Sequence, residues 1–251
     1  MAKYKRMKSA DYWFNRISKP IIGLAPMHGF TNSAFRLKCR KAGAEVVFSE
    51  MVASEAIIRR IPKAFEMMKF EESERPVVIQ IFGSNPETMK QAAEIVEREF
   101  SPDGIDINFG CPVQKAAKQG FGAVQLRDRK GAIEVIKAVK SSVKLPLSVK
   151  MRLVGPLPEE TVDFVGKLRD EGVSLITIHG RTPTQKYRGQ ANWEILHEVK
   201  KRFSDLVVLG SGDIRTLADL KNKIGNLDGV LIGRAAKINS EIFKELRKIK
   251  L

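Results

Sequence analysis

The segment PVVIQIFGSNPETMKQAAEIVEREFSPDGIDINFG, residues 76–110, decides the fold class. It begins with an apolar, β-branched run at 76–83 and ends with a second apolar run at 104–110. Between them, residues 86–100 have helical periodicity, with Pro86 in the first turn. Near-continuous apolar runs are typical of parallel strands that are buried on both faces. The segment therefore predicts a strand–helix–strand unit of a parallel sheet.

The same alternation continues along the rest of the chain. Further apolar runs predict strands at 21–27, 45–51, 146–153, 175–181, 207–213 and 229–234, and further helical patterns cover 32–43, 130–143 and 159–172. Eight strands, each followed by a helix, over about 250 residues predict an α/β fold, a single-domain (β/α)8 TIM barrel. A doubly wound open sheet is the alternative, but it would carry GxGxxG after the first strand, where this chain has APMHGF.

Composition limits the chemistry of the protein. The chain has 251 residues, 43% hydrophobic and 29% charged, as in globular proteins. Its two cysteines, Cys39 and Cys111, are too few for a disulfide framework and fit a reducing cytosol. The sequence has three histidines and neither CxxC nor HExxH, so no metal site is expected. It also lacks a signal-peptide core and an apolar stretch of membrane-spanning length, which predicts a cytoplasmic protein.

The formal net charge of +15 is the strongest compositional signal of a partner. Such a surplus attracts polyanions, RNA or DNA above all, although a solvated lysine-rich surface is the alternative. Basic residues are concentrated at both ends of the chain. We therefore expect a basic N-terminal extension over 1–20, the barrel over 21–236, and one amphipathic basic helix over 237–251.

Unusual polar residues follow the predicted strands. In a barrel, the C-terminal ends of all strands meet at one face, where barrel enzymes carry their active sites. The polar residues predicted at this face are Glu50, Gln80, Asn108, Cys111, Lys150, Arg152, His179, Arg181, Asp213 and Arg234. Their convergence predicts an enzyme.

An ordered set of motifs resembles the tRNA-dihydrouridine synthase family over about residues 21–236. The motifs are LAPMHGFTNSAFR (24–36), VIQIFGSNPETM (78–89), IDINFGCPVQKAAKQGFGAVQL (105–126), LSVKMRL (147–153), IHGRTPTQKYRGQANW (178–193), GSGDI (210–214) and GVLIGRAA (229–236). The resemblance implies a barrel that uses FMN to reduce uridine in tRNA to 5,6-dihydrouridine. It also implies NADPH or NADH as the electron donor.

Cys111 matches the position of the family's catalytic cysteine. Hydride addition to C6 of uracil leaves C5 in need of a proton, and a protonated thiol is a suitable general acid. Gly110 allows a tight turn at the strand end and Pro112 fixes the exit of the chain. Cys39 lies inside a helical pattern and is expected in the core.

The resemblance also assigns the cofactor site. It places Lys150 beside the flavin ring, where a cation stabilises the reduced, anionic form. Gln80 and His179 are expected to contact the ring, and Pro26 and Met27 to form the floor beneath it. Barrels commonly bind phosphate at the loops after strands 7 and 8. The FMN phosphate is therefore expected at Ser211, Gly212, Gly233 and Arg234, and Asp213 is expected among the other cofactor-binding residues.

Substrate contacts are expected from one strand end and two loops. The family's asparagine at the position of Asn108 reads the uracil edge. Basic side chains interleaved with an aromatic residue suit a flipped nucleotide and its flanking phosphates. The expected substrate-binding residues are Asn108, Lys115, Lys118, Arg152, Arg181, Lys186, Tyr187 and Arg188.

Three departures from the family pattern leave alternatives open. His28 stands where most relatives have a small residue, and the loop after Arg152 and Leu153 lacks the usual glycine. The segment after Arg234 has no room for the family's helical C-terminal domain, which leaves open whether an oligomer or an accessory protein helps to hold tRNA. The alternatives are a flavin barrel that reduces a free pyrimidine or another small enone, and an RNA-binding barrel without catalysis.

Overall fold

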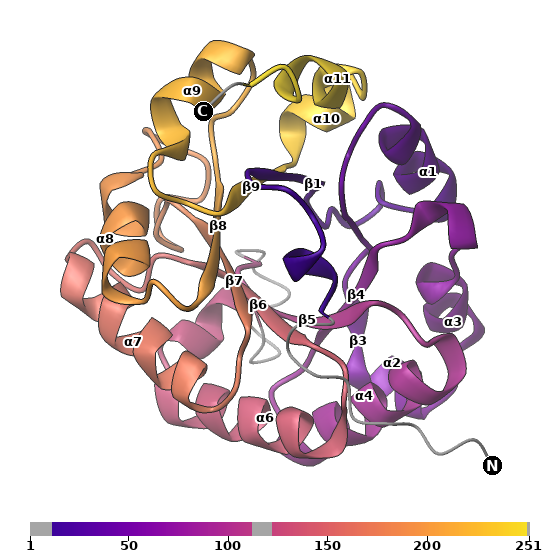
Figure 1. Ribbon diagram of the computed structural model, residues 1–251. Coiled ribbons are helices and arrows are strands. Elements are labelled where there is room, and N and C mark those ends of the chain that lie inside the picture. Colours follow the sequence, from indigo (N-terminus) through magenta and orange to yellow (C-terminus); the bar gives the residue numbers. More distant parts are fainter. Residues whose placement is uncertain (1–11, 112–121, 250–251) are drawn as a thin grey trace.

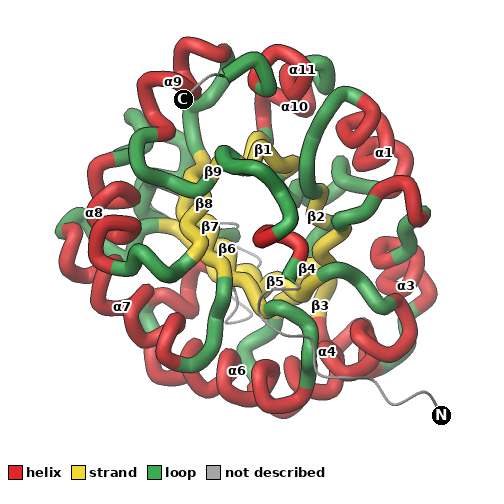
Figure 2. The backbone as a smooth tube through the Cα atoms, viewed as in Figure 1, coloured by secondary structure: helices red, strands yellow, loops and turns green. Residues whose placement is uncertain are grey.

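The computed structural model describes residues 12–111 and 122–249, which form a ring of parallel strands surrounded by helices (Figure 1, Figure 2). The strands in these residues are β1 (Ile21–Leu24), β2 (Val47–Phe48), β3 (Val52–Ala53), β4 (Val77–Phe82), β5 (Gly104–Phe109), β6 (Leu147–Arg152), β7 (Leu175–His179), β8 (Val207–Ser211) and β9 (Gly229–Ile232). The predicted single-domain (β/α)8 barrel is confirmed.

The ring closes through β2, which pairs with both β1 and β4. Val47 lies opposite Leu24 on one side and Val77 on the other. β3 pairs with the C-terminal end of β4, where Val52 lies opposite Ile81. Because β2 and β3 pair with successive parts of the same strand, β4, together they occupy one of the eight strand positions of the barrel.

The second predicted strand, 45–51, is interrupted in the structure. The hydroxyl of Ser49 accepts a hydrogen bond from the backbone N–H of Gln80, at 3.0 Å, and donates to the backbone oxygen of Glu50, at 2.8 Å. A side chain thus takes the place of a backbone partner between β2 and β3. The sequence pattern shows the apolar residues of this run but not this local substitution.

Helices cover the outside of the ring. They are α1 (Ser33–Lys41), α2 (Ser54–Ile58), α3 (Pro62–Met68), α4 (Pro86–Phe100), α6 (Arg129–Ser142), α7 (Pro158–Asp170), α8 (Glu194–Arg202), α9 (Leu217–Ile224), α10 (Arg234–Ile238) and α11 (Ile242–Leu246). Side-chain oxygens cap several of them: Asn32 accepts from the N–H of Phe35, and Asn85 accepts from those of Glu87 and Thr88. The four predicted helices are present as α1, α4, α6 and α7.

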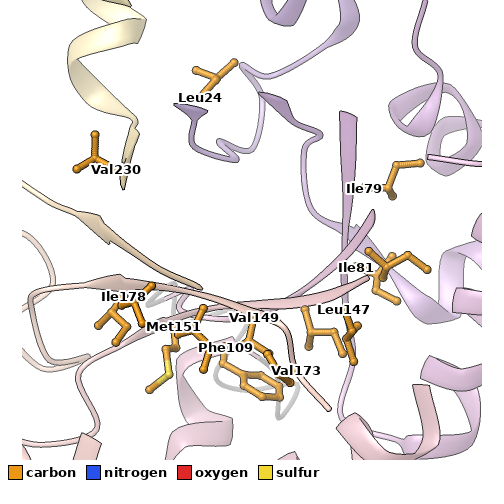
Figure 3. Close-up of a cluster of buried hydrophobic side chains, with 14 of the residues drawn as sticks. Leu24, Ile79, Ile81, Phe109, Leu147, Val149, Met151, Val173, Ile178 and Val230 are labelled. Carbon is orange, nitrogen blue, oxygen red and sulfur yellow. The ribbon is translucent and has the colours of Figure 1, made fainter. Parts of the chain in front are cut away.

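The main core fills the space between the strands and the helices. Alternate residues of each strand point outward into it, as Ile79 and Ile81 of β4 and Leu147 and Val149 of β6 do (Figure 3). The residues that alternate with them on β4 and β6, such as Gln80 and Lys150, therefore face the interior of the barrel. This alternation separates the apolar outer layer from an interior that carries polar side chains toward the C-terminal ends of these strands.

A second apolar cluster closes the N-terminal end of the barrel. The 3-10 turn η2 (Trp13–Asn15) lies in the opening of the ring in Figure 1, and Trp13 and Phe14 are buried. They pack with interior residues such as Leu175 and Val207, at the beginnings of β7 and β8. Trp13 and Phe14, expected as part of a basic extension, thus belong to the barrel core, and chemistry is left to the opposite end.

The C-terminal segment differs from the single helix expected over 237–251. In the described residues, α10 begins at Arg234 and ends at Ile238, and α11 follows over Ile242–Leu246. Asn239 separates them, with φ −146° and ψ 109°, an extended conformation that ends a helix. None of the helices in the described part of the chain has the length and apolar composition that crossing a membrane requires.

Candidate active site

Two cavities meet at the C-terminal end of the barrel. One, here called the β8–β9 cavity, has a volume of about 490 Å³ and is lined by the loops after β8 and β9. The other, the Cys111 cavity, has a volume of about 860 Å³ and extends toward α2 and α3. Both volumes lie in the range of small-molecule and cofactor sites. The residues that line both cavities are Pro26, Met27, Lys150, His179, Tyr187 and Arg234.

Glycines let the backbone line the β8–β9 cavity. Gly212 has φ +121°, and a Cβ there would lie 2.9 Å from the Cβ of Ala191. The next residue, Asp213, also has a positive φ, of 53°. Backbone strain of this kind concentrates at ligand sites, because only a required geometry retains it. The structure brings together the residues predicted to hold a phosphate, Ser211, Gly212, Gly233 and Arg234, and places Asp213 in the same cavity.

Asp213 is the electrostatic centre of this cavity. Its carboxylate accepts hydrogen bonds from Arg181 at 2.6 Å, from the N–H of Ala191 at 2.8 Å and from Arg234 at 3.2 Å. Burial disfavours its ionised form, but these donors outweigh burial and hold the pKa of Asp213 below its usual value. Asp213 therefore stays ionised and fixes the direction of the Arg234 guanidinium at the cavity wall.

Lys150 stands where the two cavities join. Its ammonium makes no hydrogen bond or ion pair with the residues that the structure describes. Burial, together with repulsion from Arg152, lowers the pKa of Lys150 to about 8, although Asp106 and Cys111 oppose this. A half-buried ammonium with unused donors at a junction of cavities is suited to an electron-rich ligand.

His179 lies beside Lys150 at the same junction. Burial, followed by the charges of Lys150, Arg152 and other cations, lowers the pKa of His179 to about 2. The imidazole is therefore neutral at physiological pH. It serves this site as a hydrogen-bonding group and not as a cation.

Cys111 lines the larger cavity at the end of β5. The carboxamide oxygen of Asn108 accepts hydrogen bonds from the backbone N–H groups of Gly110 and Cys111, each at 3.0 Å. The thiol is partly exposed, whereas Cys39 is fully buried and burial raises the pKa of Cys39 to about 12. Cys111 is thus the cysteine that a ligand can reach in the described residues.

A polar chain lies inside the barrel below Cys111. The Nδ2 of Asn108 donates to Oε1 of Gln80 at 2.8 Å, and Nε2 of Gln80 donates to Oδ2 of Asp106 at 2.7 Å. Ser148 donates to the other oxygen of Asp106 at 2.6 Å. Gln80 keeps one N–H and one lone pair for a ligand in the Cys111 cavity.

Two buried arginines hold the loop after β7. Arg152 donates to the backbone oxygens of Gly110 and Lys186, at 3.0 and 2.7 Å. Arg181 donates to the backbone oxygens of Arg188 and Gly189 and to Asp213. The loop brings the exposed ring of Tyr187 over the junction of the two cavities, within 5.4 Å of the Arg152 guanidinium and 5.0 Å of that of Arg234.

Comparison with protein families gives the site its context. A family model described as "Dihydrouridine synthase (Dus)" matches residues 23–250, almost the whole barrel. The chain belongs to the dihydrouridine synthase family. The family resemblance seen in the sequence motifs is therefore confirmed.

Relatives in this family are similar over most of the chain. A "Probable tRNA-dihydrouridine synthase" of Aquifex aeolicus is 39% identical over 231 residues, which cover 90% of this chain and 72% of the relative. One from Mycobacterium tuberculosis is 33% identical, covering 92% and 62%. A "tRNA-dihydrouridine(47) synthase NAD(P)(+)-like" protein of Xenopus laevis is 32% identical, covering 90% of this chain and 36% of its own length.

Among solved structures, a complex of 2-naphthoyl-CoA reductase with 2-naphthoyl-CoA is similar to this chain. The TM-score is 0.67 over 91% of this chain and 50% of the reductase chain. The sequence identity is only 11%, so the likeness supports the fold alone.

Some residues predicted to contact substrate have other partners in the structure. Asn108 uses its oxygen for two backbone N–H groups and its amino group for Gln80 and the sulfur of Met51. Arg152 and Arg181 are only 2% exposed and hold the loop after β7, so their side chains do not form an outer RNA-facing surface. Lys186 and Arg188 are exposed, as expected. Lys115 and Lys118 lie outside the described residues.

His28 and Glu50 form a further contact at the mouth of the Cys111 cavity. His28 Nδ1 lies 3.6 Å from Oε2 of Glu50, and the N–H of Gly29 donates to the same oxygen. Glu50 is 8% exposed and anchors the loop after β1. His28, one of the positions at which this sequence departs from the family pattern, therefore borders the Cys111 cavity.

Two parts of the site were not predicted from the sequence. Asp106 lies in the polar chain, and its signal was present: in IDIN, Asp106 is two residues before Asn108, on the same strand face. The second part is an apolar wall of the Cys111 cavity, formed by residues that no strand pattern marks. Its members on α2, α3 and the turn between them are Ala56, Ile61, Ala64 and Met67.

Proposed function

We propose that this chain is an FMN-dependent tRNA-dihydrouridine synthase that reduces a uridine of tRNA to 5,6-dihydrouridine, with NAD(P)H as the electron donor. The observation that carries the proposal is that the β8–β9 cavity and the Cys111 cavity meet at Lys150 and His179. One cavity suits a flavin nucleotide and the other a uracil base, so the two reactants would meet at this junction.

The residues of the β8–β9 cavity fit FMN. The backbone at Gly212 and Gly233 lines it, and Arg234 adds a positive charge that Asp213 orients. These groups would hold the phosphate. Lys150 has an ammonium without a partner among the described residues, which suits the electron-rich side of the flavin ring. Pro26 and Met27 line both cavities and would support the ring from below.

The protein's own part in the reaction is proton delivery and positioning. When bound and reduced, FMN supplies the hydride that goes to C6 of the uracil. Cys111 then donates its S–H proton to C5, and its thiolate takes up a proton from solvent. The neutral His179 donates or accepts a hydrogen bond at the ring without adding charge. The Asn108 carboxamide keeps the Gly110–Cys111 turn in place during this transfer.

A tRNA uridine must leave its stack to reach Cys111. Unstacking costs a few kcal/mol, which contacts at the cavity mouth have to offset. The exposed Tyr187, Lys63 and Lys237 line this cavity, and the exposed Lys186 and Arg188 are the chain neighbours of Tyr187. They provide a stacking surface and positive charge for the flanking phosphates.

The test is reduction of an unmodified tRNA transcript by purified protein, FMN and NADPH or NADH. The expected product is 5,6-dihydrouridine in the tRNA, detected by mass spectrometry of its nucleosides, and the purified protein is expected to be yellow. A colourless protein, or one that reduces free uridine or uracil but no tRNA, would overturn the proposal. In the second case the chain would be a small-molecule reductase.

A further inference from the structure

The interior of the barrel contains a buried carboxylate that the proposed reaction does not use. Asp106 is fully buried, on β5, between β4 and β6 (Figure 1). Its two oxygens accept from Gln80 at 2.7 Å and from Ser148 at 2.6 Å. Burying an ionised carboxylate is unfavourable, so its retention below an active site calls for a role beyond packing.

Asp106 is ionised near neutral pH and so acts only as an acceptor. Burial raises the pKa of Asp106 to about 6, while Gln80, Ser148 and the charge of Lys150 oppose that rise. An ionised carboxylate has no proton to donate. Gln80 must therefore present its amino group to Asp106.

This requirement fixes the direction of the whole chain of hydrogen bonds. Because the amino group of Gln80 faces Asp106, its oxygen faces Asn108, which must donate its own amino group. The oxygen of Asn108 is then left for the two N–H groups at 110 and 111. Reversing any amide would set donor against donor at the turn that carries the thiol.

We propose that Asp106 is a positioning residue for uridine reduction: through Gln80 and Asn108 it fixes the Gly110–Cys111 turn and so the place of the thiol in the Cys111 cavity. The path runs through three hydrogen bonds of 2.7, 2.8 and 3.0 Å. The catalytic use of the thiol rests on the proposed function, but the holding of the turn does not.

Ser148 provides a matched control within the same cluster. Ser148→Ala removes the second donor to Asp106 and leaves the arm through Gln80 and Asn108 intact. Asp106→Asn removes the charge but can keep the direction of the chain, because its oxygen can accept from Gln80 while its amino group donates to Ser148. Asp106→Leu removes the acceptor and keeps the branched shape of the side chain.

The experiment measures kcat and KM for tRNA with the FMN-loaded variants, together with flavin reduction by NAD(P)H and the melting temperature. For Asp106→Leu we expect kcat to fall roughly 10²-fold, as for a catalytic group displaced by about 1 Å, with KM for tRNA and flavin reduction unchanged. Asp106→Asn is expected to restore most of kcat, and Ser148→Ala to stay near wild type. If Asp106→Leu is insoluble, Asp106→Ala replaces it.

Alkylation of Cys111 by iodoacetamide gives a second readout that needs no activity. Cys39 is fully buried, so the reaction reports Cys111. We expect faster alkylation in Asp106→Leu, because the turn is released, and wild-type rates in Asp106→Asn and Ser148→Ala. A failure of the proposed function would leave this pattern intact.

Three outcomes would overturn the positioning role. The first is wild-type kcat and alkylation in Asp106→Leu. The second is equal loss in Asp106→Asn, which would make the charge and not the direction of hydrogen bonding decisive. The third is a loss of kcat in Asp106→Leu that is matched by lost flavin or by Ser148→Ala, which would make the cluster merely structural.

Discussion

Cys111 and Cys39 carry the same thiol in opposite surroundings. Cys39 is fully buried in α1, and burial raises its pKa to about 12. Cys111 is partly exposed in a cavity, on a turn held by Asn108. Side-chain type does not distinguish the two cysteines. The expected reactivity of each thiol depends on its exposure and on the position of its backbone.

Replacing Cys111 tests its role as the proton donor. Cys111→Ala is expected to bind FMN and to allow its reduction by NAD(P)H, because the thiol is assigned no part in FMN binding or in flavin reduction. Reduction of tRNA uridine is expected to fall about 10²–10⁴-fold, the usual scale of general acid catalysis. Stopped-flow absorbance measures flavin reduction, and product tRNA measures the second step. Equal loss in both steps would contradict a specific proton-donor role.

The residues of the site differ in how far the sequence could predict them. The position of Lys150 follows from its place at the end of an apolar strand, and the family motif supplies its expected role. The partners of Arg152 and Arg181 could not be predicted. Both bind backbone oxygens of a loop whose path depends on the assembled barrel. Sequence patterns place a side chain at the rim, but its hydrogen bonds depend on which groups the fold brings there.

The lowered pKa of Lys150 predicts how FMN binding depends on pH. Lys150 is protonated below about pH 8 and loses its charge above it. FMN affinity of cofactor-free protein is therefore expected to fall between pH 7 and 9, by about tenfold, the scale of one charged hydrogen bond. Flavin fluorescence titrations measure this. Lys150→Met should bind more weakly at pH 7 and show no such fall, and a fall retained in this variant would refute the assignment.

At the scale of elements, the strands were predicted better than the segments around them. Apolar runs define a buried strand directly, and β4 to β9 match their predicted positions within a few residues. The break between β2 and β3 depends on one hydroxyl, that of Ser49. The end of α10 depends on the backbone conformation of Asn239. Neither the hydroxyl of Ser49 nor the backbone conformation of Asn239 alters the spacing of apolar residues from which strands and helices are predicted.

A buried ion pair fixes the loop that carries Pro26 and Met27. Arg36 of α1 and Glu74 of η3 (Glu72–Glu74) are both fully buried, with Arg36 Nε 2.7 Å from Glu74 Oε2. Arg36 also donates to the backbone oxygen of Thr31, at 2.8 Å. The pair thus joins the end of the loop after β1 to a segment some forty residues later in the chain.

Breaking this pair should destabilise the barrel strongly. Arg36→Met leaves Glu74 buried without its cation, so the free energy of unfolding is expected to fall by about 3–5 kcal/mol. Urea unfolding of the cofactor-free protein measures it. The matched control is Arg60→Met, which breaks the exposed Arg60–Glu99 pair and should have a much smaller effect. Equal losses in the two variants would show that burial of the pair is not the cause.

At the scale of the whole molecule, net charge sets the approach of RNA. The formal charge is +15, and the exposed cations Lys63 and Lys237 line the Cys111 cavity, while the exposed Lys186 and Arg188 adjoin Tyr187, which also lines it. Cations near a cavity attract an anionic polymer and raise its rate of association. The cations that attract RNA and the site proposed for its reduction therefore lie at the same face of the barrel.

The last prediction is the salt dependence of tRNA binding. Each phosphate that a cation neutralises releases condensed counterions, so log affinity falls against log salt with a slope of about −0.7 to −0.9 per phosphate. Lys186→Glu and Arg188→Glu are each expected to weaken binding and to reduce the magnitude of this slope by about that amount. Lys201→Glu is the matched control, because Lys201 is exposed near the end of α8, at the opposite end of the barrel.

The measurement is the tRNA affinity of wild type and of the three variants at a series of salt concentrations. If Lys201→Glu changed the slope as much as Lys186→Glu, the attraction would come from overall charge, because the mouth of the cavity would have no special part in it. Binding that did not depend on salt would exclude phosphate contacts as the source of affinity. A wild-type protein that reduced free uridine but failed to bind tRNA at low salt would show that the Cys111 cavity binds a small molecule. The cations around its mouth would then have to be explained without RNA.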